Sequence, residues 1–329
     1  MKNNKLAVIG VGHVGSYVLA DAMKTDLFSE IVVIDKDKDV AFGEALDQAH
    51  ATALTYMANT NVYAGDYQDV KDADIIIIAA GPSVIITDKN AKPDRALLAE
   101  VNADVIREVM EGITTYTKDA IIILITNPLD TIVYIAENEF GYPKGRLFGT
   151  GTMLDSARLR HAVASNYNID PKSVTGYMMG EHGMTAFPVF SRLNVQGFGE
   201  KELDIHFQGK EALNREVFGQ KVVDTAYDVI TSKGWTNAAI AQAAITLAKA
   251  VLLDERSVYP VCTTLNGQYG YEGDVAFSMP CIIGKNGVEQ QLEIELDEEE
   301  MKLLHKSAQY IQETMRIAGT GKDKRVKSS

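Results

Sequence analysis

Three residues near the middle of the chain have types and spacing suited to proton transfer and anion binding. Asp155 and Arg158 lie three positions apart in a segment with a helical pattern, so a carboxylate and a guanidinium share one helix face. His182 lies in the stretch Gly180–Gly183, where glycines leave room around its ring. An imidazole titrates near neutrality and suits general acid–base chemistry, while a guanidinium can hold a carboxylate with two parallel hydrogen bonds. Taken singly, each of these residues is more often structural than catalytic.

A glycine pattern near the N-terminus indicates a dinucleotide site. Gly10, Gly12 and Gly15 form G-x-G-x-x-G between an apolar run and a helical pattern, and Asp35 ends the next apolar run. Gly10 allows a tight turn, Gly12 lets the backbone approach a pyrophosphate, and Gly15 lets helix and strand pack closely. The Asp35 carboxylate can accept hydrogen bonds from a ribose 2′-hydroxyl and would repel a 2′-phosphate. The expected cofactor is therefore NAD rather than NADP.

The elements that must position these groups alternate along the first half of the chain. Continuous β-branched runs such as Asp74–Ala80, separated by helical patterns such as Gly15–Met23, predict parallel strands covered by helices. Residues 1–150 are thus predicted to form a doubly wound, Rossmann-type α/β domain that binds NAD. Residues 151–329 mix helical patterns with strand-like pieces such as Val189–Leu193. They predict an α+β domain that carries the catalytic and substrate-binding groups.

Composition restricts the class of protein. The net charge of −13 argues against a nucleic-acid partner, which would need a basic face. The longest apolar runs are far shorter than the ~20 residues of a membrane span, so no membrane partner is expected. The two cysteines, Cys262 and Cys281, lack metal-ligand spacing and fit a reduced compartment. We therefore expect a cytoplasmic protein without a metal site, in which specific arginines bind any anionic substrate.

Together, these motifs resemble the lactate/malate dehydrogenase superfamily over essentially the whole chain. The stretch Leu265–Gly270 followed by Met279-Pro280 is similar to the L-lactate dehydrogenase branch in particular. The resemblance implies hydride transfer between NAD and the C2 carbon of a small 2-oxo/2-hydroxy acid, with pyruvate and L-lactate as the expected pair. The other matching stretches are Gly10–Gly15, Ile34-Asp35, Gly43–Asp47, Thr126–Pro128, Gly149–Arg158, Gly180–Gly183 and Lys233–Thr236.

The resemblance also implies a role for each candidate residue. His182 would donate a proton to the substrate ketone, and Asp155 would fix the tautomer of its ring and favour the imidazolium. Arg158 would clamp the substrate carboxylate. Asn127 would help hold the nicotinamide or the substrate, and Thr236 would line the pocket. The remaining histidines are expected to be structural or superficial: His13, His50, His161, His206 and His305.

The segment from Gly81 to Arg95 corresponds to the lid that closes over substrate in this family. Arg95 matches the lid arginine that polarises the substrate carbonyl, because Asn102 follows it at the family spacing. The segment is longer than in typical lactate dehydrogenases and is similar to that of the L-2-hydroxyisocaproate dehydrogenases, which admit branched side chains. It contains no arginine before Arg95, and Asp88 would repel a second carboxylate, so oxaloacetate is disfavoured. Bulkier 2-oxo acids are the main alternative to pyruvate. A malate dehydrogenase and a non-catalytic NAD-binding sensor are less favoured.

Two further expectations concern regulation and assembly. Many bacterial lactate dehydrogenases bind fructose 1,6-bisphosphate with a paired arginine and histidine. Arg160 matches the arginine, but Thr175 stands where the family has the histidine, so we expect weak or absent activation. The resemblance implies a homotetramer, with a dimer as the alternative.

Overall fold

The computed structural model describes residues 3–83 and 95–320, apart from the side chains of residues 95–97. Within these ranges nine strands form one sheet, in the order β14-β13-β12-β6-β5-β4-β1-β2-β3. The strands from β6 to β3 run parallel, with β1 paired to both β2 and β4. The strands are β1 (Lys5–Ile9), β2 (Glu30–Ile34), β3 (Asn61–Ala64), β4 (Ile75–Ile78), β5 (Ile121–Leu124), β6 (Leu147–Gly149), β12 (Ser257–Asn266), β13 (Glu272–Gly284) and β14 (Gly287–Gln291).

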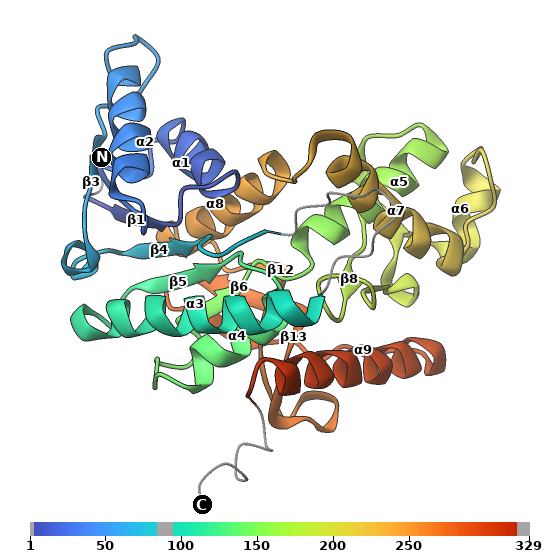
Figure 1. Cartoon of the computed structure of the whole chain (residues 1–329). Coiled ribbons are helices and arrows are strands. Elements are labelled where there is room, and N and C mark those ends of the chain that lie inside the picture. Colours follow the sequence, from blue (N-terminus) through green and yellow to red (C-terminus); the bar gives the residue numbers. More distant parts are fainter. Residues whose placement is uncertain (1–2, 84–94, 321–329) are drawn as a thin grey trace, which may run out of the picture.

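Helices cover both faces of this sheet (Figure 1). Helices α1, α2 and α8 pack on one face and α3 and α4 on the other, while α9 packs along β13 and against α3 and α4. The doubly wound fold class is therefore confirmed. The helices are α1 (Gly15–Met23), α2 (Lys38–Ala51), α3 (Arg95–Tyr116), α4 (Leu129–Asn138), α5 (Met153–Tyr167), α6 (Glu200–His206), α7 (Arg215–Lys233), α8 (Ala238–Leu252) and α9 (Glu298–Ile317).

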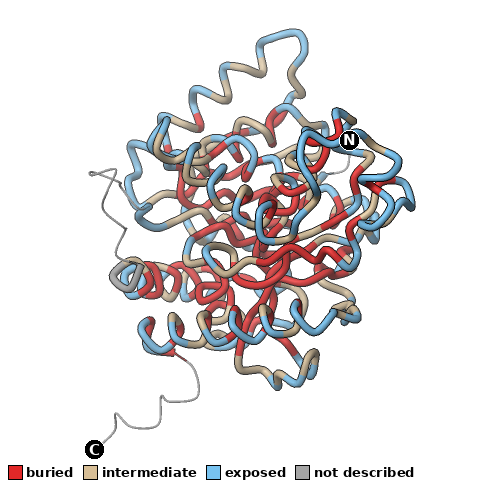
Figure 2. Tube along the Cα trace, turned by 90° about the vertical axis from the view of Figure 1, so that its right-hand side faces the viewer, coloured by how far each residue is buried: buried red, intermediate tan, exposed pale blue. Residues whose placement is uncertain are grey.

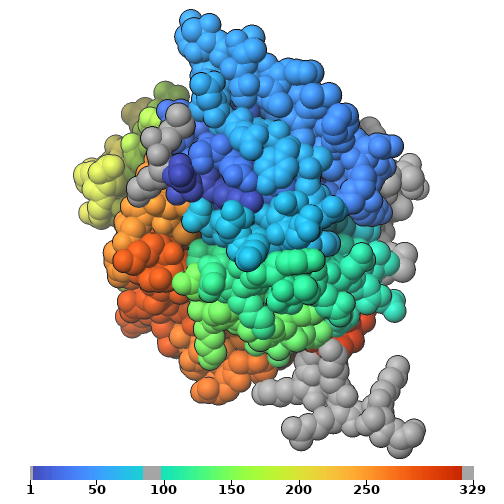
Figure 3. Space-filling model, turned by 90° about the vertical axis from the view of Figure 1, so that its left-hand side faces the viewer, coloured from blue at the N-terminus to red at the C-terminus, as the bar shows by residue number. Residues whose placement is uncertain are grey.

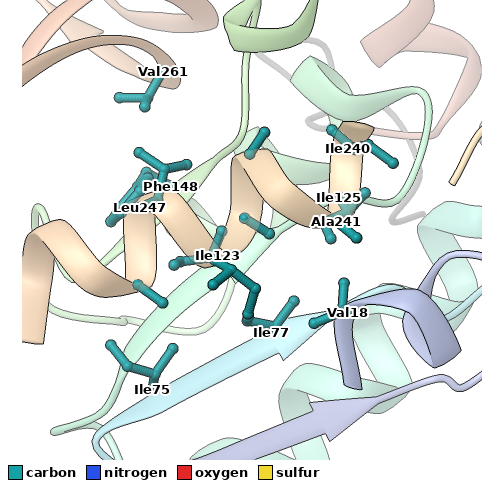
Figure 4. Packing of buried hydrophobic residues seen from close by; sticks show 14 of the residues in the cluster. Val18, Ile75, Ile77, Ile123, Ile125, Phe148, Ile240, Ala241, Leu247 and Val261 are labelled. Carbon is teal, nitrogen blue, oxygen red and sulfur yellow. The ribbon is translucent and has the colours of Figure 1, made fainter. Parts of the chain in front are cut away.

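Successive residues of a central strand face opposite helical layers. In β4, Ile75 and Ile77 pack with α1 and α8, whereas Ile76 and Ile78 pack with α3 and α4. Both faces are covered, which explains why the strand is a continuous apolar run without alternation. Figure 4 shows the first layer, where Ile77 lies close to the residues of α8. The buried segments accordingly run through the middle of the molecule in Figure 2.

The strands of the second half continue the sheet of the first half. Strand β12 pairs antiparallel with β6, where Cys262 lies opposite Gly149, and β13 and β14 follow as antiparallel neighbours. On the face drawn in Figure 3, N-terminal and C-terminal residues accordingly meet on one continuous surface. A separate core forms between α5 and α7, with Leu159 and Phe218 among its buried residues. The division at residues 150 and 151 stays a prediction, since one sheet crosses it.

The prediction of a strand at Val189–Leu193 is wrong. This segment forms a single 3-10 turn at Phe190–Arg192, closed by the backbone bond from Leu193 N to Phe190 O at 3.0 Å. Phe190 and Leu193 are both buried, and a spacing of three places them on the same side of such a turn. The short strands β3 and β6 were not anticipated. In β3, Val62 is the one buried residue, so the apolar pattern of this segment is too weak to signal a strand.

Candidate active site

A cavity of 290 Å³ opens at the carboxyl ends of β1, β4 and β5. The strand order reverses between β1 and β4, and ligands of open α/β sheets bind in the crevice at such a switch point. Residues following each of these strands line the cavity, as do residues of α5, α7 and the segment before α8. Among them are His13, Asn127, Asp155, Arg158, His182, Trp235 and Thr236.

The glycine-rich turn joins β1 to α1 at the edge of this cavity. Gly10 has φ +86°, and a Cβ there would lie 2.5 Å from the Cα of Ala80, so the turn requires glycine. A Cβ on Gly15 would lie 1.8 Å from the carbonyl oxygen of Gly10, which agrees with the predicted close packing of helix and strand. Gly12 differs, because a Cβ there would have no heavy atom within 4 Å. The open side of the turn therefore lies at Gly12.

Asp35 stands beside this turn at the end of β2. Its Oδ2 accepts the backbone N–H of Val11 at 2.8 Å, and its Oδ1 accepts that of Asp37 at 3.0 Å. Open space at Gly12, backbone N–H donors at the N-terminus of α1 and an adjacent carboxylate acceptor form the surroundings expected for a dinucleotide with a free ribose hydroxyl. The residues present thus fit NAD, with Gly10, Gly12, Gly15 and Asp35 at the positions predicted to hold it.

One carboxylate joins the histidine and the arginine singled out from the sequence. His182 Nδ1 donates to Asp155 Oδ2 at 2.6 Å, and Arg158 Nη1 donates to Asp155 Oδ1 at 2.9 Å. Asp155 and Arg158 project from the same face of α5, as their spacing predicted. All three side chains are largely buried and line the cavity. The ring nitrogen opposite Nδ1 is thereby left for a ligand of the cavity.

The charges in this group reinforce one another. Burial alone would lower the pKa of His182, but the charge of Asp155 and its hydrogen bond outweigh burial and raise that pKa above its ordinary value. Burial alone would raise the pKa of Asp155, yet the charges of His182 and Arg158 lower it. The arrangement therefore favours an imidazolium paired with a carboxylate, which is a form of histidine able to donate a proton.

The other predicted residues fall into two groups. Asn127 and Thr236 line the cavity, and the carbonyl oxygen of Asn127 accepts a hydrogen bond from Asn102 Nδ2 at 2.6 Å. The Arg95 side chain lies outside the described residues, although α3 begins at this position. Residues 84–94 of the predicted lid, including Asp88, also lie outside them, whereas Gly81, Pro82 and Ser83 line the cavity.

Two site residues were missed from the sequence. His13 was expected to be structural or superficial; it is exposed, but it lines the cavity and its ring stacks on Trp235 at 3.9 Å between centroids. Its position inside the glycine motif was an available signal. Asp130 accepts the backbone N–H of His182 on Oδ2 at 2.8 Å. Its position just after Asn127-Pro128 was the corresponding signal, but nothing local showed that it faces residue 182.

The fold and this site define an NAD-binding dehydrogenase class, and comparison with known proteins identifies the family. The NAD-binding domain of lactate/malate dehydrogenases matches residues 4–149, and their α/β C-terminal domain matches residues 152–318. The chain belongs to the lactate/malate dehydrogenase family.

Particular relatives cover nearly the whole chain. L-lactate dehydrogenase 2 of Clostridium acetobutylicum is 44% identical over 97% of this chain and 98% of its own length. L-lactate dehydrogenase of Selenomonas ruminantium is 42% identical over 96% of this chain and 98% of its own. A solved lactate dehydrogenase from a Medee basin deep-sea metagenome library is 30% identical with a TM-score of 0.89, covering 97% of this chain and all of the other. Cryptosporidium parvum malate dehydrogenase is 28% identical with a TM-score of 0.87, over 96% of this chain and 99% of its own.

The described ranges lack both a membrane-spanning helix and a metal-binding cluster. No helix in residues 3–83 and 95–320 combines the length and apolar character that crossing a bilayer requires. The same ranges hold no cluster of three or more histidine, cysteine or acidic side chains that could bind a metal ion.

Proposed function

We propose that this protein is an NAD-dependent L-lactate dehydrogenase, which interconverts pyruvate and L-lactate. The observation that carries the proposal is the shared carboxylate of Asp155, which bonds His182 at 2.6 Å and Arg158 at 2.9 Å beside the crevice of an NAD-binding fold. A proton donor and a carboxylate-binding cation are the two groups that reduction of a 2-oxo acid requires from the protein. The relatives of more than 40% identity carry the same activity in their names.

His182 is proposed as the proton donor to the ketone oxygen. Asp155 holds Nδ1, so Nε2 is the nitrogen that carries the transferable proton, and the raised pKa of His182 favours the protonated ring. Bound NADH would supply the hydride. In the direction of lactate oxidation the same ring, in its neutral form, would accept the hydroxyl proton.

Arg158 is proposed to hold the substrate carboxylate. Its Nη1 is committed to Asp155, which orients the planar guanidinium in the cavity wall. Such a fork can form two parallel hydrogen bonds with a carboxylate. Arg95 is proposed to polarise the substrate carbonyl, and Asn127 and Thr236 to complete the pocket.

NAD rather than NADP is proposed as the cofactor because of Asp35. Its carboxylate is held next to the glycine-rich turn by the N–H groups of Val11 and Asp37, so a 2′-phosphate at the ribose would meet a negative charge. We expect Asp35→Ser to weaken the preference for NADH over NADPH by at least about tenfold, since removing the charge removes the repulsion. Steady-state kcat/KM values with each coenzyme, for wild type and variant, measure this ratio. An unchanged ratio would contradict the role of Asp35.

A dehydrogenase of the L-2-hydroxyisocaproate type is the second candidate. The observation in its favour is that α7 contributes the apolar residues Val223, Ala226 and Ile230 to the cavity wall. A pocket of this kind discriminates by roughly 1–3 kcal/mol per methylene group, so overlap between substrates is expected.

A panel of 2-oxo acids tests these candidates. The proposal expects kcat/KM with NADH to be highest for pyruvate, lower for 2-oxoisocaproate and lowest for oxaloacetate. A maximum at 2-oxoisocaproate would favour the second candidate, and a maximum at oxaloacetate would indicate a malate dehydrogenase. Tight NADH binding without turnover of any acid would indicate a sensor.

We also propose that the protein acts as a homotetramer, or as a dimer, in the cytoplasm. Helix α2 exposes Val40, Phe42 and Leu46 to solvent, and neighbouring exposed apolar side chains often mark an interface. Sedimentation equilibrium tests the assembly, and a monomer at micromolar concentration would contradict it.

Activation by fructose 1,6-bisphosphate is expected to be weak because Thr175 replaces the family histidine. A strong decrease of the pyruvate KM at millimolar bisphosphate would contradict this.

A further inference from the structure

The backbone of His182 is held by a second carboxylate, that of Asp130 on α4. Oδ2 of Asp130 accepts the N–H of His182 at 2.8 Å, while the ring of the same histidine donates to Asp155. His182 is therefore fixed at two points, by carboxylates from two different helices. Asp155 determines the orientation of the ring, and Asp130 determines the place of the main chain that carries it.

The burial of Asp130 is unusual for a residue with this position in a helix. An acidic residue in the first turn of a helix is favoured by the helix dipole, and such residues are ordinarily exposed. Asp130 is only 3% exposed, and Oδ1 has no hydrogen-bond partner that meets ordinary geometry among the described residues. A buried carboxylate with incomplete hydrogen bonding costs stability. The helix dipole accounts for an acid here but not for its burial against residue 182.

Acidic, basic and thiol groups surround His182 and Asp130. His182 meets Asp155 and Arg158 from α5 and Asp130 from α4. Asp130 meets His182, the neighbouring Glu181, and the thiol of Cys262 on β12. Burial, followed by the charge of Glu181, raises the pKa of Asp130 to about 7, whereas His182 and Cys262 act to lower it. The negative charge of Asp130 in turn raises the pKa of His182.

We propose that Asp130 is a positioning residue for His182, whose carboxylate both anchors the backbone of the proton donor and supplies a second negative charge beside its ring. This inference rests on the proposed function, since it assigns Asp130 to the proton transfer of that site. Asp130 acts through His182 and needs no contact with substrate.

Two substitutions separate the two effects. Asp130→Asn keeps an oxygen that can accept the His182 N–H but removes the charge. We expect it to retain most of the maximal turnover, while the pH at which oxo-acid reduction declines on the alkaline side moves down by about 0.5–1 unit. Asp130→Ala removes the acceptor as well. We expect kcat to fall a further ~10–100-fold, because a displaced donor transfers its proton poorly, while NADH binding is preserved.

Glu137→Gln is the matched control. Glu137 lies on the same helix, is half-buried, also has a pKa raised to about 7, and accepts hydrogen bonds from Thr263 and Thr264 on β12, away from His182. We expect this variant to keep the wild-type pH profile. Thermal unfolding of each variant shows whether it is folded. If Asp130→Ala fails to fold, the pH profile of Asp130→Asn alone tests the proposal.

The measurement is the pH dependence of kcat/KM and kcat for pyruvate reduction, together with NADH affinity. The proposal is supported if the pH at which reduction declines on the alkaline side moves down in Asp130→Asn but not in Glu137→Gln. A wild-type profile in Asp130→Asn, or an equal shift in Glu137→Gln, overturns it. His182→Asn is measured alongside the Asp130 variants. If His182→Asn keeps its turnover, the proposed function itself fails. If His182→Asn loses its turnover but both Asp130 variants keep the wild-type pH profile, only the inference about Asp130 fails.

Discussion

At the scale of single residues, the chemistry of the site depends on how Asp155 divides its two oxygens. One oxygen bonds the histidine ring and the other bonds Arg158, so the carboxylate orients a proton donor and an anion-binding group together. Both cations also lower the pKa of Asp155 and keep it charged. A neutral residue at position 155 would therefore disturb proton transfer and substrate binding at once.

Replacing the proposed proton donor should abolish most turnover. We expect His182→Asn to lower kcat for pyruvate reduction by about 10³-fold or more, since the amide cannot deliver a proton to the ketone oxygen. Stopped-flow or steady-state rates measure the loss, and the rise of NADH fluorescence on binding serves as the control for an intact cofactor site. Turnover within tenfold of wild type would contradict the assignment.

Replacing the proposed carboxylate clamp should chiefly affect substrate binding. Arg158→Lys retains a positive charge but loses the planar fork, so one of the two parallel hydrogen bonds to a carboxylate is lost. We expect the KM for pyruvate to rise by about 10–100-fold, with a smaller change in the KM for NADH. Equal effects on both constants would indicate that Arg158 acts on the whole site rather than on the substrate.

At the scale of elements, the site lies where segments from both halves of the chain meet. The turn between β1 and α1 lies against the segment that joins α7 to α8. The contact is made by His13 in the turn, whose ring stacks on that of Trp235 in the segment with an interplanar angle of 3°. Thr236 follows directly on the second segment. The nucleotide turn and one wall of the proposed substrate pocket are thus in direct contact.

Trp235 should report on cofactor binding. It is the single tryptophan of the chain, and it lines the cavity next to the glycine-rich turn. We expect saturable quenching of tryptophan emission when NADH is added, because the dinucleotide would occupy the space beside this ring. Trp235→Phe is the control, which should lose the signal but still bind NADH as measured by NADH fluorescence. Unchanged Trp235 emission at saturating NADH would place the cofactor elsewhere.

At the scale of the whole molecule, one sheet joins the two halves of the chain, and a half-buried carboxylate accepts hydrogen bonds across their junction. Glu137 on α4 accepts hydrogen bonds from Thr263 Oγ1 and from Thr264 N, both at 2.7 Å, on β12. Burial raises the pKa of Glu137 to about 7, although hydrogen bonds from these threonines act to lower it. Its ionisation therefore bears on the stability of the whole fold.

The stability of the protein should depend on the charge of Glu137. The pKa of this group is raised in the folded state, so its contribution to stability is complete below the unfolded value near 4.5 and is lost as the pH rises through about 7. The loss amounts to roughly 3 kcal/mol. Glu137→Gln does not titrate, so its melting temperature relative to wild type should increase between pH 5 and pH 8. Thermal unfolding at both pH values checks this, and a constant difference would contradict it.

Local features of the sequence were sufficient for the fold class and for much of the site. The β-branched runs indicated parallel strands because each must bury both faces, and β4 does so with every residue. The glycine-rich turn was identified because the backbone requirement at its first glycine is local, as the φ of Gly10 shows. The spacing of Asp155 and Arg158 placed them on one face because helix geometry is periodic.

The sequence by itself thus determined which residues carry usable chemistry and which short segments hold them. The family resemblance also implied that His182 meets Asp155 across 27 positions. Only the tertiary structure decided that Asp130 meets His182 across 52 positions and that His13 meets Trp235. It also decided that β12 extends the first sheet. Such contacts depend on the packing of whole helices and strands, and the period of a single segment carries no information about its distant neighbour.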